Sequence, residues 1–196
     1  MNKKSKTGLF FGSFNPVHVG HLIIANHIAT HGDVNEVWLV VSPQNPHKQK
    51  SSLANDYKRL DMVNVAVEGN AKLKGSNIEF SLPQPSYTVD TLAYLKEKFP
   101  QKEFVLIMGG DNLQTFHKWK NFEVILENHA IYVYKRPKAT NGQFVGHPKV
   151  TIFDAPMMNI SARYIRKQLK KQDVESIRYL VTAPVFDYLE QTNLYR

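Results

Sequence analysis

An α/β fold, with an open parallel sheet and helices on both of its faces, is predicted by two features of the sequence. Short apolar segments of strand character alternate with longer segments of helical period, and this alternation is typical of parallel sheets. The chain of 196 residues, of which 42% are hydrophobic, is also long enough to bury one sizeable core. We therefore expect one Rossmann-like domain over residues 1–196, with a small helical portion from about residue 160.

The expected strands are short apolar runs bounded by glycine, proline or polar residues. They cover residues 9–11, 37–41, 78–82, 104–108, 130–134 and 150–153. The run at 104–108 is unbroken and leads into Gly109 and Gly110, so we expect it at the centre of the sheet. A loop is expected at 139–148, before the last strand.

The expected helices carry apolar residues three or four positions apart. They cover residues 18–30, 55 or 56 through 67, 88 to just before Pro100, and 161–171, followed by one or two short helices near the C-terminus. The side chains expected to face the core are Leu22, Ile23, Ala29, Tyr57, Leu60, Val63, Val67, Val89, Leu92 and Leu95. Asn55 or Asp56, Thr88 and Ser161 have the side chains preferred at helix N-caps.

The composition excludes several classes of protein. Because the chain has no cysteine, it can form no disulfide framework, no thiolate metal site and no cysteine nucleophile. No apolar run reaches the roughly 20 residues that a membrane span needs, and the N-terminal sequence shows no signal-peptide pattern. We therefore expect a cytoplasmic protein without a membrane partner.

The chain is basic, with a net charge of +8, so we expect anionic partners. This charge does not separate nucleotides from polynucleotides. The densest basic stretch lies at 163–171, where helical spacing favours a solvated face for every cation except Arg166. The chain lacks the interleaved aromatic and basic residues expected of single-strand binders, so we expect no nucleic-acid partner.

Residues 12–21 read Gly-Ser-Phe-Asn-Pro-Val-His-Val-Gly-His and join the first expected strand to the first expected helix. The free N–H groups and the dipole of a helix N-terminus attract anions, so this junction suits phosphate. His18 and His21 share a helix face, from which both can reach one phosphate group. A metal site would need a third ligand, and none is nearby on this face. Phosphate binding, metal binding and core packing are therefore all compatible with the spacing.

A second motif stands near the C-terminus, where residues 160–166 read Ile-Ser-Ala-Arg-Tyr-Ile-Arg. Residues 12–21 resemble the HxGH signature of the nucleotidyltransferase superfamily, and residues 160–166 resemble the second motif of the same superfamily. Its members transfer a nucleoside monophosphate and release pyrophosphate. Two matching motifs at the two ends of one chain are far less expected by chance than either motif alone.

Four further places resemble one branch of that superfamily, nicotinate mononucleotide adenylyltransferase. They are residues 43–48, 86–92, 109–111 with 119–120, and 188–195, so the resemblance spans nearly the whole chain. Asn15 stands where many members carry Asp, Ala162 and Arg163 replace small hydroxyl residues, and Gly110 replaces a more usual alanine. None of these departures removes a charged group that the chemistry needs.

The resemblance implies catalytic roles for His18, His21, Lys48 and Arg166. It implies that ATP is bound by Gly12, Ser13, Phe14, His18, His21, Gly109, Asp111, Ile160, Ser161 and Arg166. It implies that the mononucleotide is bound by Thr88, Trp119 and Lys120, with backbone N–H groups at Thr88 receiving the carboxylate and Trp119 stacking on the pyridine ring. A solvated loop position for Lys48, a helix cap for Asp111 and a core position for Trp119 are the structural alternatives. His47 and Arg136 receive no role.

The expected reaction is attack by the 5′-phosphate of nicotinate mononucleotide on the α-phosphorus of ATP. Mg²⁺ would accompany ATP, bound mainly by phosphates and water. The alternatives are nicotinamide mononucleotide or phosphopantetheine as the acceptor, and a non-catalytic nucleotide- or RNA-binding module. The sequence is compatible with a monomer and with a homo-oligomer.

Overall fold

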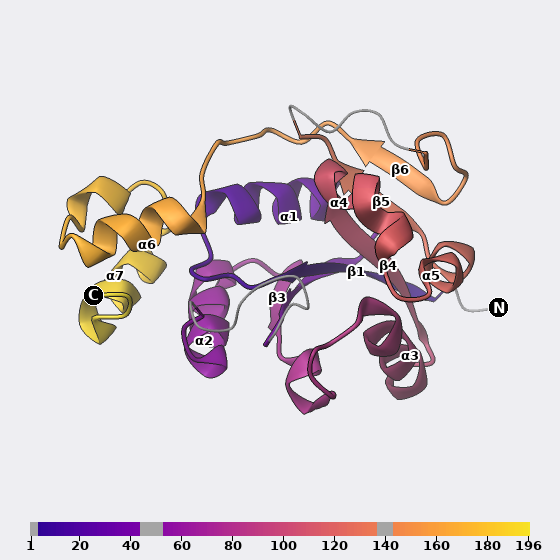
Figure 1. The fold of residues 1–196 in the computed structure, drawn as a ribbon, viewed down its shortest axis with the longest axis horizontal. Helices are drawn as coiled ribbons and strands as arrows, with labels where there is room; N and C mark the ends of the chain where they lie inside the picture. Colours follow the sequence, from indigo (N-terminus) through magenta and orange to yellow (C-terminus); the bar gives the residue numbers. More distant parts are fainter. Residues whose placement is uncertain (1–3, 44–52, 137–142) are drawn as a thin grey trace.

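The computed structural model describes residues 4–43, 53–136 and 143–196, and its centre is one six-stranded sheet (Figure 1). Every neighbouring pair of strands is parallel, in the order β3-β2-β1-β4-β5-β6. The strands are β1 (Ser5–Gly12), β2 (Glu36–Val41), β3 (Leu73–Ser76), β4 (Lys102–Gly109), β5 (Ile131–Tyr134) and β6 (Val150–Phe153). The predicted Rossmann-like parallel sheet, with the fourth strand near its centre, is confirmed.

Helices connect the strands and complete the C-terminal part of the chain. The α-helices are α1 (Val19–His31), α2 (Asp56–Val67), α3 (Thr88–Lys98), α4 (Gly110–Thr115), α5 (Phe122–Asn128), α6 (Ala162–Lys170) and α7 (Ala183–Thr192). The 3₁₀ helices are η2 (Ile78–Ser81), η3 (Phe116–Lys118) and η4 (Glu175–Ile177). The sequence pattern predicts no element at α4, η3 and α5, because these segments have only six, three and seven residues.

Successive side chains of the central strands pack into two different cores, one on each face of the sheet. Phe10, Val105 and Ile107 join the core that includes buried residues of α1, α2, α6 and α7. Leu9 and Leu106 join the core that includes buried residues of α3, α4 and α5. Because adjacent residues of a strand point to opposite faces, this division confirms that helices cover both faces of the sheet (Figure 1).

The strand order reverses direction next to β1. The chain passes from β1 to β2 and β3 on one side, and then returns to β4, β5 and β6 on the other. In open parallel sheets a ligand crevice forms at such a switch point, outside the carboxyl ends of the strands. Gly12 and Gly109 end the two strands that meet there, so this edge of the sheet is the expected site.

The predicted strand at 78–82 is wrong, because these residues form η2 instead. The third strand is β3, in which Leu73 lies opposite Val37 of β2. Its sequence Leu-Lys-Gly-Ser contains one large apolar residue and so carries no strand pattern of its own. In η2, Glu79 is buried and its Oε1 accepts a hydrogen bond from Thr91 Oγ1 at 2.8 Å. Pairing with β2, rather than local periodicity, places β3.

The inward face of α2 differs in part from the predicted one. Tyr57 was expected in the core but is 63% exposed and packs edge-on against Phe80 at the surface. Val63 and Val67 are buried as predicted. Arg59 is fully buried, because its guanidinium finds hydrogen-bond acceptors on neighbouring loops. A charged residue thus occupies an inward position that apolar periodicity does not reveal.

Two of the predicted helix caps are confirmed and one is wrong. Asn55 caps α2, and the Ser161 hydroxyl accepts a hydrogen bond from the backbone N–H of Tyr164 at 3.2 Å to cap α6. Thr88 is not a cap, since it is the first residue of α3 and Tyr87 occupies the capping position. Its backbone N–H nevertheless belongs to the first turn of a helix.

The buried faces of α1 and α3 follow the predicted periodicity with one shift. Leu92 and Leu95 of α3 are buried, as is Ala29 of α1. Leu22 and Ile23 are only half-buried, because α1 turns Ile24, Ala25 and Ile28 fully toward the sheet. The shift does not change the position of the helix start, which carries the first motif.

The C-terminal helices form the end of the molecule beside α2 (Figure 1). The backbone N–H of Val19, the first residue of α1, donates a 3.0 Å hydrogen bond to the carbonyl of Leu180 between η4 and α7. The predicted short helices after the second motif are therefore present and contact the first motif. Within the described ranges, no helix is long and apolar enough to cross a membrane.

Candidate active site

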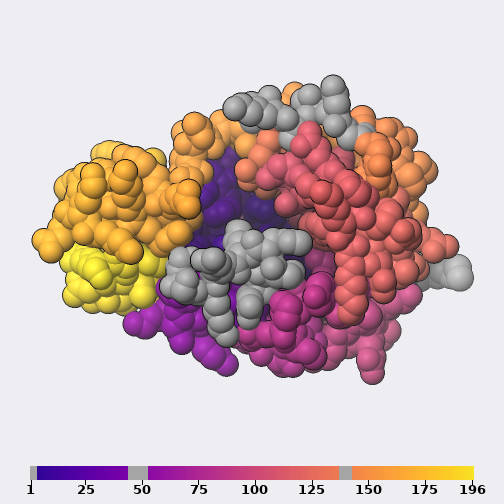
Figure 2. Space-filling model, viewed as in Figure 1, coloured from indigo at the N-terminus to yellow at the C-terminus, as the bar shows by residue number. Residues whose placement is uncertain are grey.

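A cavity of about 1380 Å³ opens at the switch point of the sheet. Figure 2 shows this hollow between the C-terminal helices and the segments that follow β4 and β5, with the N-terminal part of the chain at its floor. Eight residues predicted from the sequence line it: Ser13, Phe14, His18, His21, Asp111, Ile160, Ser161 and Arg166. The fold therefore brings the two terminal motifs to one cavity.

Five of the remaining predicted residues do not line the cavity. Gly12 and Gly109 are not part of the lining, and Thr88, Trp119 and Lys120 are also outside it. A Cβ at Gly12 would come within 2.8 Å of the Phe14 ring, and one at Gly109 would collide with the Asp111 carboxylate. These glycines make room for two side chains that line the cavity. Lys48 lies outside the described residues.

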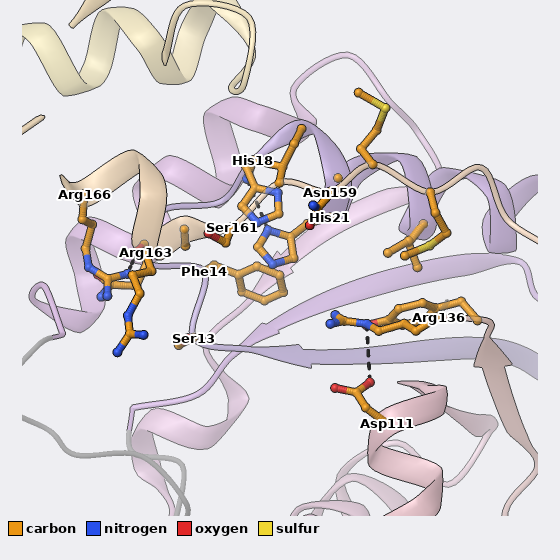
Figure 3. Close-up of a pocket in the computed structure, with 18 of the residues that line it drawn as sticks. Ser13, Phe14, His18, His21, Asp111, Arg136, Asn159, Ser161, Arg163 and Arg166 are labelled. Carbon is orange, nitrogen blue, oxygen red and sulfur yellow. Dashed lines mark hydrogen bonds and ion pairs between the residues drawn. The ribbon is translucent and has the colours of Figure 1, made fainter. Parts of the chain in front are cut away.

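His18 and His21 form a stacked pair at the start of α1 (Figure 3). Their ring centroids are 3.7 Å apart with an interplanar angle of 22°, and the His18 backbone N–H donates to His21 Nδ1 at 3.3 Å. The Phe14 ring packs edge-on against His21 at 5.1 Å. Since Nδ1 of His21 accepts this hydrogen bond, the neutral imidazole carries its proton on Nε2.

Burial keeps His18 neutral at neutral pH. The side chain is 7% exposed, and desolvation together with the nearby Arg136 cation lowers the pKa of His18 to about 4. Its Nδ1 has no hydrogen-bond partner among the residues that the structure describes. An anionic group beside this ring would favour the imidazolium and raise the pKa again. The site is thus arranged to gain a positive charge when it meets an anion.

Arg166 connects the second motif to the first. It lies in α6, and its Nη1 donates a 2.7 Å hydrogen bond to the backbone carbonyl of Asn15, 151 residues earlier in the sequence. Arg163 is exposed, as predicted, and it also lines the cavity. In Figure 3 both guanidinium groups lie on the α6 side of the histidine pair.

An ion pair between Arg136 and Asp111 stands on the opposite side of the cavity (Figure 3). Arg136 Nε is 3.4 Å from Asp111 Oδ1, and Arg136 Nη2 donates to Tyr134 Oη at 3.3 Å. Arg136 lies two residues after the end of β5, at the same sheet edge as the histidines. The cavity therefore has cations on both sides, although the sequence analysis assigned Arg136 no role.

Sequence reasoning missed Arg59, which supports the turn that joins β1 to α1. This fully buried side chain donates four hydrogen bonds: to Ser13 O at 2.5 Å, Ser42 O at 3.0 Å, Ala54 O at 3.0 Å and Asp56 Oδ1 at 2.6 Å. It joins the end of β1, the end of β2 and the start of α2. Arg59 lies three and four residues before the buried Met62 and Val63. This helical spacing is the one signal in the sequence that Arg59 faces the core.

The three residues predicted to bind the mononucleotide contact other protein groups. Lys120 Nζ forms a 2.8 Å ion pair with Asp90 and lies 4.8 Å from the centre of the Tyr87 ring. Trp119 is half-buried and packs edge-on against Phe116 at 5.5 Å. Trp119 therefore lies partly in the core, which was the structural alternative to a binding role. Through these contacts with Tyr87 and Asp90, Lys120 lies against the start of α3, whose first residue is Thr88.

The described residues contain no group of three or more His, Cys, Asp or Glu side chains that could hold a metal ion. The histidine pair instead stands at a helix start beside arginines, which is an arrangement for binding anions. Its geometry suits a polyphosphate better than a coordinated cation.

Comparison with known proteins agrees with this geometry. Residues 9–168 match the Cytidylyltransferase-like family. The chain is 55% identical, over the full length of both chains, to a probable nicotinate-nucleotide adenylyltransferase of Christiangramia forsetii. The chain belongs to the nicotinate-nucleotide adenylyltransferase family. A second member, from Flavobacterium psychrophilum, is 52% identical over 97% of this chain and 99% of its own.

The fold is shared with solved structures of the same family. Nicotinic acid mononucleotide adenylyltransferase of Plasmodium falciparum, complexed with NaAD, superposes with a TM-score of 0.81 over 97% of both chains at 22% identity. The same enzyme complexed with APC gives a TM-score of 0.80. At this level of identity the likeness concerns the fold, and the residue roles depend on the geometry above.

Proposed function

We propose that this protein transfers the adenylyl group of ATP to nicotinate mononucleotide, which yields nicotinate adenine dinucleotide and pyrophosphate in NAD biosynthesis. The names of the relatives at 52% and 55% identity support this activity. The observation that carries it is the meeting of His18, His21 and Arg166 at one cavity, although they belong to motifs at opposite ends of the chain. ATP and pyridine nucleotides occur in the cytoplasm, so we propose that the enzyme acts there.

In the proposed reaction a 5′-phosphate oxygen of the mononucleotide attacks the α-phosphorus of ATP. A new P–O bond forms, the bond between the α-phosphorus and the bridging oxygen breaks, and pyrophosphate leaves with both bonding electrons. No covalent enzyme intermediate is needed, so positioning and electrostatic stabilisation supply the rate. His18, His21 and Arg166 would stabilise the negative charge that builds on the phosphate oxygens, and Lys48 keeps its predicted role there.

The neutral state of His18 fits this role. With a pKa of about 4, the ring of the ligand-free protein carries no charge at neutral pH. The triphosphate of ATP would raise that pKa, because it supplies negative charge to a group that burial has desolvated. His18 then takes up a proton as ATP binds and donates a hydrogen bond to a phosphate oxygen.

Magnesium fits the site as a companion of ATP rather than as a resident ion. The described residues provide no cluster of metal ligands, which agrees with the preference of Mg²⁺ for phosphate and water oxygens. When bound, it would neutralise phosphate charge. Asp111, which is half-exposed at the cavity, would accept hydrogen bonds from the ribose hydroxyls of ATP.

Thr88, Trp119 and Lys120 form the proposed mononucleotide side of the site. The first turn of α3 offers backbone N–H groups to the nicotinate carboxylate, as helix N-termini do for other anions. Trp119 would stack on the pyridinium ring, since an aromatic face attracts both flat rings and cations. An amide in place of the carboxylate would lose the electrostatic part of this contact, so we expect nicotinate to be preferred over nicotinamide.

The decisive experiment measures pyrophosphate release by the purified protein with ATP and Mg²⁺. Parallel reactions contain nicotinate mononucleotide, nicotinamide mononucleotide, phosphopantetheine or no acceptor. We expect release to depend on an acceptor and to be fastest with nicotinate mononucleotide. Release with phosphopantetheine alone would replace the proposed acceptor, and no release in any reaction would favour a non-catalytic nucleotide-binding module.

A further inference from the structure

The end of the chain returns to the first motif. Tyr195, the second-last residue, donates a 2.6 Å hydrogen bond from its hydroxyl to Oδ1 of Asn15, 180 residues earlier. Asn15 is 2% exposed, and the same Oδ1 accepts a 3.1 Å hydrogen bond from the backbone N–H of Ala54. Two segments far apart in sequence therefore hold one side chain of the turn that joins β1 to α1.

The backbone carbonyl of Asn15 orients a residue of the candidate active site. This carbonyl accepts the 2.7 Å hydrogen bond from Nη1 of Arg166. An arginine that uses one N–H group in this way presents the rest of its planar guanidinium in a defined direction. Arg166 lines the cavity, so Asn15 stands between Tyr195 and a group that faces the polyphosphate.

Backbone geometry on both sides of this contact points to a functional constraint. Phe14, next to Asn15, has φ 42°, and Tyr195 itself has φ 73°. Both values lie in the left-handed region, which is unfavourable for side chains other than glycine. Such conformations persist where surrounding contacts enforce them, and they gather at binding sites. The Tyr195 hydroxyl supplies one of the enforcing contacts.

The phenol of Tyr195 is a permanent donor in this arrangement. Burial raises the pKa of its hydroxyl above the ordinary value, and the opposing effect of the Arg166 and Arg59 cations is smaller. The hydroxyl therefore stays protonated throughout the pH range in which an enzyme is assayed. Its hydrogen bond to Asn15 does not depend on pH.

We propose that Tyr195 is a positioning residue for adenylyl transfer, which holds Asn15 and thereby fixes the direction in which Arg166 meets the phosphates of ATP. This inference rests on the proposed function. It assigns a role in the reaction to a residue that lies outside both motifs and does not line the cavity.

The test compares two tyrosine variants from the same C-terminal segment. Tyr195→Phe removes the hydroxyl but keeps the buried ring. Tyr188→Phe is the matched control, because its hydroxyl donates a 3.4 Å hydrogen bond to the exposed Asp61 rather than to a residue of the first motif. Steady-state kinetics give kcat and KM for ATP and for nicotinate mononucleotide, and thermal unfolding midpoints report the fold of each variant.

We expect Tyr195→Phe to lower kcat/KM for ATP about five- to tenfold, the effect of losing one buried hydrogen bond. The KM for the mononucleotide should stay within about twofold of wild type, and Tyr188→Phe should match wild type throughout. A Tyr195→Phe enzyme that is folded and has wild-type kcat/KM for ATP would overturn the inference. An equal loss in Tyr188→Phe would also overturn it.

A double-variant cycle separates positioning from a general structural effect. If Tyr195 acts through Arg166, then Tyr195→Phe should cause no further loss of kcat/KM for ATP in an Arg166→Ala background. A full, additive loss there contradicts the inference. Failure of the proposed function is distinguishable, because then the wild-type protein itself releases no pyrophosphate with ATP and nicotinate mononucleotide.

Discussion

The two sides of the candidate site are held in different ways. On the polyphosphate side, groups from distant parts of the chain support the turn between β1 and α1: the fully buried Arg59 from α2, and the partly buried Arg166 from α6 and Tyr195 from the C-terminus. On the mononucleotide side, Lys120 and its partner Asp90 are about half-exposed and form a surface ion pair. Buried hydrogen bonds to charged groups are strong, whereas exposed ion pairs contribute about 0–1 kcal/mol.

This difference indicates which side is preorganised for chemistry. Stabilising charge on reacting phosphates requires donors that do not move during the reaction, and a rigid, buried turn satisfies that need. Recognition of a planar ring requires less rigidity, so weak surface contacts can exchange for contacts with substrate. We therefore expect changes on the polyphosphate side to reduce turnover, and changes on the mononucleotide side to alter KM.

The largest effect is expected from His18→Ala. Loss of one preorganised donor to a reacting phosphate should lower kcat by about 100- to 1000-fold, while the fold is retained. Steady-state pyrophosphate release measures the change. The control is His31→Ala at the exposed C-terminal end of the same helix, which should keep wild-type turnover. Near-normal turnover of the His18 variant would remove the histidine from the mechanism.

Arg59→Met tests the support beneath the turn. Removing this buried cation leaves the carbonyls of Ser13, Ser42 and Ala54 without their donor, so we expect the free energy of unfolding to fall by about 3 kcal/mol. Urea denaturation followed by circular dichroism measures it. Lys58→Met, at the exposed neighbouring position, should leave stability within about 0.5 kcal/mol of wild type. Equal stabilities of the two variants would contradict the assigned support.

The pH dependence of stability tests the burial of His18. Its pKa is about 4 in the folded protein against 6.5 as the ordinary value, so the unfolded chain binds the proton more readily. Stability from this group is complete above pH 6.5 and is lost as the pH falls toward 4. The total loss is about 3 kcal/mol.

The measurement is urea denaturation at several pH values for wild type and His18→Asn, because their difference isolates this histidine from all other titrating groups. The variant should lose less stability than wild type between pH 6.5 and 4. Parallel curves for the two proteins would show that the ring titrates normally.

The smallest effect is expected on the mononucleotide side. Trp119→Ala should raise KM for nicotinate mononucleotide about tenfold, since stacking on an aromatic ring contributes about 1 kcal/mol or slightly more. The KM for ATP should not change. Lys118→Ala, at an exposed position one residue earlier, is the control. If Trp119→Ala changed both KM values equally, the tryptophan would be a core residue rather than a stacking platform.

Much of the fold follows from local patterns. Five of the six predicted strand segments coincide with strands, because each is an apolar run between glycine, proline or polar residues. The exception is the segment at 78–82, which forms η2. The strand lies instead at β3, where Leu73 is the single large apolar residue and pairing with β2 decides the structure. The short helices between β4 and β5 escaped prediction for a related reason, since six or seven residues hold less than two turns.

The residues of the candidate site likewise fall into those that local sequence predicts and those that only the structure reveals. Motif resemblance found His18, His21, Asp111 and Arg166, and the fold brings all four to one cavity. It did not find Arg136, which carries no motif of its own, nor Arg59, which appears as one more charged residue on an amphipathic helix. Both are recognised by what surrounds them in space.

Local sequence was sufficient for the parallel α/β architecture and for finding the two motifs that meet at the cavity, because apolar period, helix caps and helix dipoles act over a few neighbouring residues. Long-range packing set the rest: the buried position of Arg59, the low pKa of His18 and the contact from Tyr195 to Asn15. Each of these depends on the distance and burial of groups far apart in the chain, and no local pattern encodes such quantities.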